Sequence, residues 1–127
     1  MQTEAGAVAF VTFYFEQVNK AWMTPDATLL PPLASAECQG CAALTEDARK
    51  LQLAGKRYAE TPIHLNRVTP VPGARASQQY VSFLLEQPRV DIVDTNGQVV
   101  GRQEAGTKNF EILLKWEEGR WLALGIG

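Results

Sequence analysis

Two cysteines separated by two residues, Cys38 and Cys41, have the spacing in this sequence that points most directly to chemistry. The spacing fits a local disulfide, a thiol–disulfide exchange pair or half of a metal site. A structural zinc site needs four ligands, whereas this chain holds two thiols and one imidazole, so we expect no bound metal. Cysteines three positions apart at the start of a helix bring their Cα atoms to roughly 5–6 Å, within disulfide range. We therefore expect a structural disulfide, with free thiols or redox catalysis as the alternatives.

His64 is the only histidine, so any acid–base or triad chemistry that needs an imidazole depends on it. It alternates with Ile63 and Leu65 in an expected strand, which places it on the face opposite to both. If these apolar neighbours point into the core, His64 is exposed to solvent. No Gly-x-Ser-x-Gly motif accompanies it, so we do not expect a serine hydrolase.

Two tyrosines, Tyr14 and Tyr58, could donate phenol hydroxyls to a cavity in which Asp91 or Glu86 supplies a carboxylate. A carboxyl group in an apolar pocket has a raised pKa and can then exchange protons with a substrate. A buried tyrosine hydroxyl more commonly forms a hydrogen bond with the backbone. We therefore expect no catalytic residue and no cofactor, and a small isomerase, cyclase or dehydratase is the alternative.

Six aromatic side chains fall at expected core positions and are the candidate ligand-binding residues. They are Phe10, Tyr14, Trp22, Phe83, Phe110 and Trp116. Large side chains tend to fill a protein interior at high packing density. A filled core is therefore the first expectation, and an open apolar pocket lined by these rings is the alternative.

A helix over residues 4–22, capped by Thr3, is the first of the elements that must position these side chains. Its apolar residues recur at alternating spacings of three and four, and a second apolar set covers most of the remaining circumference. The two sets are Val8, Val11, Phe15, Val18 and Trp22, and Ala7, Phe10, Tyr14 and Ala21. The residues left for solvent are Thr12, Glu16, Gln17, Asn19 and Lys20. A helix with so much apolar surface must be enclosed by other elements.

Two more helices are expected before the strands. Thr24-Pro25-Asp26 supplies a cap, a proline and an acidic first turn for a short helix through residue 30, which Pro31-Pro32 ends. Ser35 is the expected N-cap of a third helix over residues 36–54, which Ala54-Gly55 stops.

Alternating apolar residues after Gly55 predict strands over residues 63–69, 77–87, 90–93, 99–100, 108–117 and 121–126. Asn96-Gly97 is a strong hairpin signal, and Gln87-Pro88 marks an edge or a bulge. Helices followed by strands imply an α+β fold, and long strands with a bulge midway curl. We predict one domain, residues 1–127, in which the first helix lies in the concave face of a curved, mostly antiparallel sheet. The third helix closes the side of this cone-shaped α+β barrel.

Composition narrows the classes of partner. Lysine and arginine number 12 against 14 acidic residues, so a net charge of −2 offers no general attraction to nucleic acid. The longest apolar stretch, residues 5–15, is far shorter than the segment of about 20 residues that crosses a bilayer. Met1-Gln2-Thr3-Glu4 does not begin a signal peptide, so an exported form would have lost its signal already.

Three features resemble a group of actinobacterial lipoproteins with a domain of unknown function in the nuclear transport factor 2-like superfamily. They are Glu4 to Phe10 with Tyr14-Phe15, the segment 24–33, and Cys38-Gln39-Gly40-Cys41. The superfamily, also called SnoaL-like or cystatin-like, has the cone fold expected above. The resemblance implies an export signal, a lipid-bearing cysteine and a tether before the domain, and therefore an extracytoplasmic location at the cell envelope. It implies no activity, because the group has none established.

Together these observations predict a non-enzymatic, extracytoplasmic domain that binds a protein partner or a small apolar ligand at the cell envelope. The alternatives are the isomerase-type enzyme, with a pocket carboxylate and tyrosine, and an envelope thiol–disulfide protein. Membrane contact is expected only through a lipid anchor that this chain lacks. Leu113, Leu122 and Leu124 either lie opposite the expected inner residues of their strands or share the face with the third helix, depending on register. If they are exposed together, they form an apolar patch through which a homodimer could form.

Overall fold

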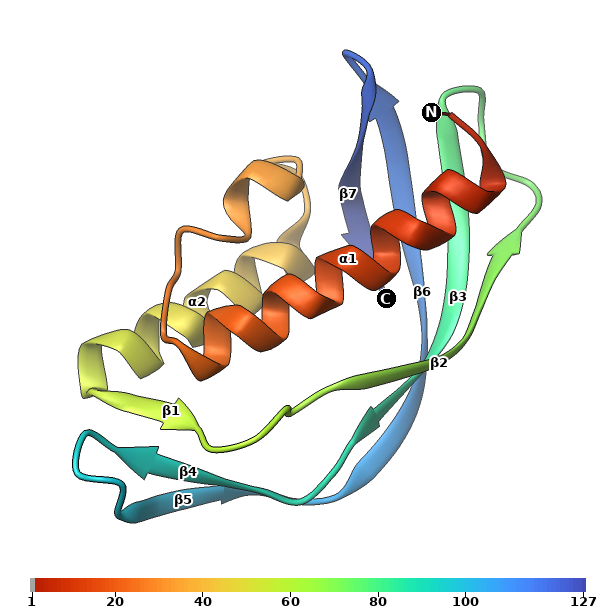
Figure 1. The fold of residues 1–127 in the computed structure, drawn as a ribbon. Coiled ribbons are helices and arrows are strands. Elements are labelled where there is room, and N and C mark those ends of the chain that lie inside the picture. Colours follow the sequence, from red (N-terminus) through yellow and green to blue (C-terminus); the bar gives the residue numbers. More distant parts are fainter. Residues whose placement is uncertain (1) are drawn as a thin grey trace.

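The computed structural model describes residues 2–127, in which two α-helices precede seven strands (Figure 1). The helices are α1 (Glu4–Met23) and α2 (Gln39–Ala54), with a short 3-10 helix at Pro31–Leu33 between them. The strands are β1 (Lys56–Tyr58), β2 (His64–Val71), β3 (Gln78–Gln87), β4 (Val90–Asp94), β5 (Val99–Gln103), β6 (Gly106–Glu117) and β7 (Arg120–Ile126). The predicted α+β class, with helices first and strands second, is confirmed.

The strands form two antiparallel sheets that together make one curved surface. The larger sheet has the order β2-β3-β6-β7, and the smaller has the order β1-β4-β5. The two sheets are continuous, because β3 passes into β4 at Pro88 and β5 passes into β6 at Ala105 (Figure 1). The Gln103 amide holds this bend, since its Nε2 donates to the carbonyls of Pro62 and Pro88, each at 2.9 Å.

Helix α1 lies across the concave side of the curved sheet, as predicted (Figure 1). The Thr3 Oγ1 atom accepts a hydrogen bond from the Gly6 N–H at 2.9 Å and caps the helix. The face turned to the sheet and to α2 is buried and comprises Ala7, Val11, Tyr14, Phe15, Val18, Ala21 and Trp22. The opposite face carries exposed Thr12, Glu16 and Lys20. The helix is therefore cradled along one side, not enclosed all round.

Asn19 was expected to face solvent, but its side chain fastens α1 to the segment before β2. The Asn19 Nδ2 donates to the Ile63 carbonyl at 2.9 Å, and its Oδ1 accepts from the Ile63 N–H at 3.0 Å. This pair satisfies both backbone groups of a residue that has no strand partner.

Helix α2 packs beside α1 and contacts β7 and β1, so it closes the side of the cone as predicted. None of the helices described is both long and apolar enough to span a membrane.

The short helix predicted before residue 30 is wrong. Residues 24–30 form turns, and the helical segment is the 3-10 helix Pro31–Leu33. The reason is the side chain of Asp26, whose Oδ1 accepts from the Thr28 N–H at 2.9 Å and from the Thr28 hydroxyl at 2.5 Å. A carboxylate that binds the backbone two residues ahead forms a turn in competition with a helix.

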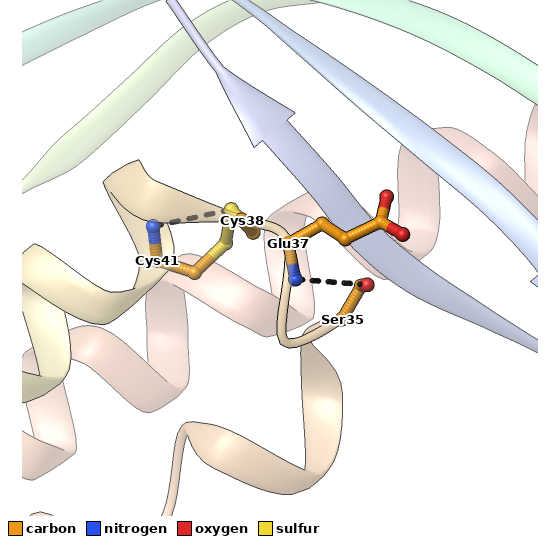
Figure 2. The surroundings of a disulfide bond; sticks show 4 residues. All are labelled: Ser35, Glu37, Cys38 and Cys41. Carbon is orange, nitrogen blue, oxygen red and sulfur yellow. Dashed lines mark hydrogen bonds between the residues drawn. A yellow bond between two sulfur atoms is a disulfide. The ribbon is translucent and has the colours of Figure 1, made fainter.

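The predicted start of α2 is also wrong, because the helix begins at Gln39 and its N-cap is Cys38. Ser35 acts one turn earlier, where its hydroxyl accepts from the Glu37 N–H at 3.2 Å (Figure 2). The sequence alone placed the start of the helix at the first hydroxyl, whereas the chain makes a separate turn there.

Strand β2 extends to Val71 through Pro70, which was expected to end it. Because β2 pairs only with β3 in its sheet, a proline without an N–H costs no hydrogen bond on its open side. Strand β1 was not predicted, since three residues are too few to show an alternating pattern.

Candidate ligand-binding groove

The disulfide predicted between Cys38 and Cys41 is present at the start of α2 (Figure 2). The two Cα atoms lie 5.2 Å apart, and the two residues are 1% and 2% exposed. Cys38 Sγ also accepts a hydrogen bond from the Cys41 N–H at 3.1 Å. Buried sulfurs that cap a helix fit a structural bond better than thiol exchange, which needs an accessible sulfur.

The six aromatic candidates pack mainly against other rings. Tyr14 lies 5.3 Å from Phe15, Phe15 lies 5.1 Å from Phe83, and Phe83 lies 5.9 Å from Phe110, measured between ring centroids. Phe10 stacks on Tyr14, and Trp116 meets Trp121 at 5.1 Å. Tyr14, Trp22 and Phe83 belong to the buried core, whereas Phe10, Phe110 and Trp116 are partly buried and pack against it. Phe83 and Phe110 also line a separate hollow of 570 Å³, and the role of the six rings in ligand binding stays a prediction.

Tyr14 is fully buried, and its hydroxyl finds no hydrogen-bond partner among residues 2–127. Burial raises the pKa of Tyr14. The carboxylates suggested as its partners lie elsewhere: Asp91 on β4 pairs with Arg102 at 3.4 Å, and Glu86 on β3 lies opposite His64. His64 is exposed, as expected. Within residues 2–127, therefore, neither Asp91 nor Glu86 pairs with the Tyr14 hydroxyl.

A different tyrosine, Tyr58, lines a groove of 420 Å³ between the second half of α2 and the small sheet. The α2 residues of its lining are Asp47, Lys50, Leu51 and Ala54, and the sheet residues are Lys56, Tyr58, Ile92, Val100 and Gly101. The groove thus combines apolar side chains with a carboxyl, a phenol and two ammonium groups.

The sequence around Gly55 brings the two walls of this groove together. Gly55 ends α2 in the left-handed conformation at φ 66°, which a side chain would disfavour, and β1 follows at once. Strand β1 then pairs with β4, so that Tyr58 lies opposite Ile92. The chain therefore turns back on α2 and leaves the groove between helix and sheet.

Gly101 on β5 keeps the sheet side of the groove open. It lies opposite Ile92, and a Cβ atom at this position would approach the Ile92 side chain to 3.8 Å, an ordinary contact. A larger side chain at position 101 would therefore fit the backbone but occupy the groove.

Tyr58 packs against the core on the side away from the groove. Its ring stacks on Trp22 with centroids 5.4 Å apart, and the Trp22 Nε1 donates to the Leu44 carbonyl at 3.2 Å. Burial raises the pKa of Tyr58, and the negative charge of Asp47 raises it further. The phenol therefore stays protonated at neutral pH and can donate a hydrogen bond into the groove.

Asp47 faces the same space, and burial raises its pKa against the opposing effect of Lys50. From the sequence we predict Tyr58 as a possible hydrogen-bond donor, but we propose Asp91 or Glu86 as the carboxylate and miss Asp47. The missed signal is a helical spacing: Asp47, Leu51 and Ala54 lie at i, i+4 and i+7, and such positions share one face. A carboxyl beside an apolar stripe marked this face of α2.

Another hollow, of 350 Å³, lies beside the disulfide and has a mostly apolar lining. The charged residue of its lining, Glu46, is already bonded to Arg49, with an Nε–Oε2 distance of 2.9 Å. The α2–β1 groove is the stronger candidate, because it holds charged groups without such a partner. No group of three or more histidine, cysteine, aspartate or glutamate side chains in residues 2–127 is arranged to hold a metal ion.

Residues 1–126 match a protein family described as a family of unknown function, DUF6318. The chain belongs to this family. No curated protein matches the sequence. The predicted resemblance to a domain of unknown function is confirmed, and its lipoprotein character stays a prediction.

Solved structures with the same fold are similar over nearly the whole domain. The intermembrane space region of the chloroplast protein ARC6 has 14% sequence identity and a TM-score of 0.73, over 100% of this chain and 96% of that one. An uncharacterised protein with a cystatin-like fold from Caulobacter vibrioides has 11% identity and a TM-score of 0.59, over 96% and 87%. An NTF2-like protein of unknown function from Pseudomonas putida KT2440 has 10% identity and a TM-score of 0.57, over 96% and 84%. The predicted cystatin-like, NTF2-like cone is confirmed for this DUF6318 domain.

Proposed function

We propose that this DUF6318 domain is an extracytoplasmic binding domain that holds a small apolar ligand in the groove between α2 and the β1-β4-β5 sheet. The observation that carries the proposal is the combination of apolar walls with the phenol of Tyr58 in one groove of 420 Å³. Small-molecule sites typically have volumes of about 300–1,000 Å³, with apolar walls and a few polar groups that fix orientation.

Apolar surface in the groove supplies the driving force. Leu51, Ala54 and Ile92 contribute to the walls, and Val100 at the edge is 45% exposed. Each 100 Å² of apolar surface removed from water contributes about 2.5 kcal/mol. The groove therefore favours a ligand with a substantial apolar part.

Two observations support the extracytoplasmic location. The Cys38–Cys41 disulfide is a type of bond that persists in oxidising compartments and is rare in the cytosol. The similar ARC6 structure is an intermembrane space region. Attachment to the cell envelope through a lipid anchor is part of the proposal and rests on the resemblance to actinobacterial lipoproteins.

Filling the groove tests the proposal. The purified domain is titrated with Nile red, a neutral apolar dye whose fluorescence rises in apolar sites, and is compared with the variant Gly101→Leu. Neither Gly101 nor the control position Gly106 has a left-handed backbone, and nothing lies within 4 Å of a Cβ at Gly106. Circular dichroism and thermal melting confirm that both variants fold.

We expect saturable dye binding that Gly101→Leu weakens by at least about tenfold, or 1.4 kcal/mol, while Gly106→Leu leaves it unchanged. Equal binding by the wild-type domain and Gly101→Leu would overturn the proposal. A loss of binding in Gly106→Leu alone would place the dye at the bend between β5 and β6 and would also overturn it.

A further inference from the structure

Charged side chains in the lining of the groove restrict the class of ligand further than its apolar walls do. Lys50 on α2 and Lys56 on β1 both line the groove, and both are exposed. The ion pairs within residues 2–127 are Glu46–Arg49, Asp91–Arg102 and Lys115–Glu117. Neither groove lysine belongs to one of them. Asp47 lies one helical turn from Lys50, and Asp94 lies opposite Lys56 in the β1–β4 pair, but neither lysine forms an ion pair with these carboxylates.

Asp47 is the single acidic residue in the lining of this groove. With Asp47 ionised, the lining carries two positive charges and one negative charge, so its net charge is +1. Asp47 is also the one group in the lining whose negative charge offsets the charge of the lysines, and burial raises its pKa. The excess positive charge would repel a cationic ligand, because two ammonium groups face it for one carboxylate. The same excess attracts an anionic ligand.

The lining of the groove has an apolar part and a charged part, which different residues supply. Leu51, Ile92 and Val100 supply hydrocarbon surface from three elements, whereas Lys50 and Lys56 reach it from α2 and β1. A ligand that satisfies both parts has an apolar chain and one acidic group. The Tyr58 hydroxyl can donate a hydrogen bond to the same acidic oxygen.

We infer that the ligand of this groove is a single-chain amphipathic anion, an apolar chain with an acidic headgroup bound between Lys50 and Lys56. The inference rests on the proposed function and specifies its ligand class. The volume of 420 Å³ lies toward the lower part of the range for small-molecule sites, about 300–1,000 Å³, which suits one chain of medium length. A lysine is a point charge that binds carboxylate and phosphate alike, so the headgroup chemistry is that of either oxyanion.

Competition against Nile red tests the headgroup with three probes of equal chain length: decanoate, decyl phosphate and decanol. The variants are Lys50→Gln, Lys56→Gln and the double substitution, and Lys108→Gln on β6 is the matched control outside the groove. An exposed ion pair typically contributes 0.2–1 kcal/mol, or about 1.5- to fivefold in affinity. All probes are measured below the concentration at which they form micelles.

We expect at least one of the two anions to bind about tenfold more tightly than decanol. Each single lysine substitution should weaken that anion by about two- to fivefold and the double substitution by more, with decanol and Lys108→Gln unaffected. The anion that binds more tightly identifies carboxylate or phosphate as the source of the headgroup.

Decanol binding as tightly as both anions, or anion affinities that do not respond to the lysine substitutions, would overturn the inference and leave the apolar site intact. Absence of binding for all three probes and for Nile red would overturn the proposed function itself. The two failures are therefore distinguishable in one set of titrations.

Discussion

The indole of Trp22 on α1 stacks on the phenol ring of Tyr58 on β1, with ring centroids 5.4 Å apart and planes inclined by 23°. Trp22 belongs to the buried core, whereas Tyr58 lines the groove. The contact therefore joins the part of the molecule that provides stability to the part that we propose binds a ligand.

Truncating Trp22 should disturb both parts. Trp22→Ala removes a side chain that is only 6% exposed, and we expect a loss of about 3–5 kcal/mol in the free energy of unfolding. Urea denaturation measures this loss. Trp22→Phe keeps a ring against Tyr58 but loses the hydrogen bond to Leu44, so it should cost less than the alanine. A change below 0.5 kcal/mol for Trp22→Ala, about the size of a neutral surface substitution, would show that the stack is not formed.

The disulfide should stabilise the domain only modestly, because it closes a very short loop. The two cysteines are three positions apart, and the chain-entropy contribution of so small a loop is on the order of 2 kcal/mol at most. We expect Cys38→Ser/Cys41→Ser to fold and to lose no more than this amount in urea denaturation.

The matched pair Cys38→Ala/Cys41→Ala separates the bond from the helix cap. Cys38 is the N-cap of α2, and serine can replace its acceptor whereas alanine cannot. The alanine pair should therefore be about 1 kcal/mol less stable than the serine pair. Equal stabilities would show that the capping contact contributes nothing, and an unfolded serine pair would show that the bond holds the whole domain together.

Tyr14 offers a substitution that should stabilise the protein. Its hydroxyl is buried without a hydrogen-bond partner in residues 2–127, and an unsatisfied buried polar group costs about 1–3 kcal/mol. Tyr14→Phe removes that oxygen and keeps the ring that packs on Phe15. We expect an increase in the free energy of unfolding of about 1 kcal/mol. A decrease of similar size would reveal a bonding partner for the hydroxyl.

Much of this fold follows from local patterns. The 3–4 spacing of α1, the Asn96-Gly97 turn and the alternation along β3 and β6 each depend on residues close together in sequence, and the structure contains all four elements. The disulfide was predictable for the same reason, since its cysteines lie within one helical turn.

The groove could not be predicted in the same way. One of its walls is β1, a strand of three residues that exists because it pairs with β4 more than 30 positions later, as in the pair Tyr58 and Ile92. Such pairing is set by tertiary contacts that no local period shows. In the sequence alone, Asp47 therefore cannot be distinguished from an ordinary polar residue on the surface of a helix.

Binding of an anionic ligand should strengthen as the pH falls. The charged and titratable groups around Asp47 are Glu46 and Lys50 on α2 and Lys56 and Tyr58 on β1, and burial is the largest influence on its raised pKa. When the pH falls through that pKa, which lies above the usual value of about 3.9, Asp47 loses its negative charge while both lysines remain protonated. Repulsion of the ligand then decreases.

Decanesulfonate is the probe for this pH dependence, because its own charge does not change in the range. We expect affinity to rise about two- to fivefold across the transition. Asp47→Asn should bind at all pH values as tightly as the wild-type domain does at low pH. An unchanged pH profile in Asp47→Asn would assign the effect to another group.

The most direct test of the account is a two-dimensional NMR titration of the 15N-labelled domain with decanoate, which reports the position of the ligand residue by residue. We expect saturable shifts of backbone amides along the second half of α2 and along β1, β4 and β5, centred on Asp47, Tyr58 and Gly101. Shifts centred on Phe83 and Phe110 in the larger sheet, or no saturable shifts at all, would contradict it.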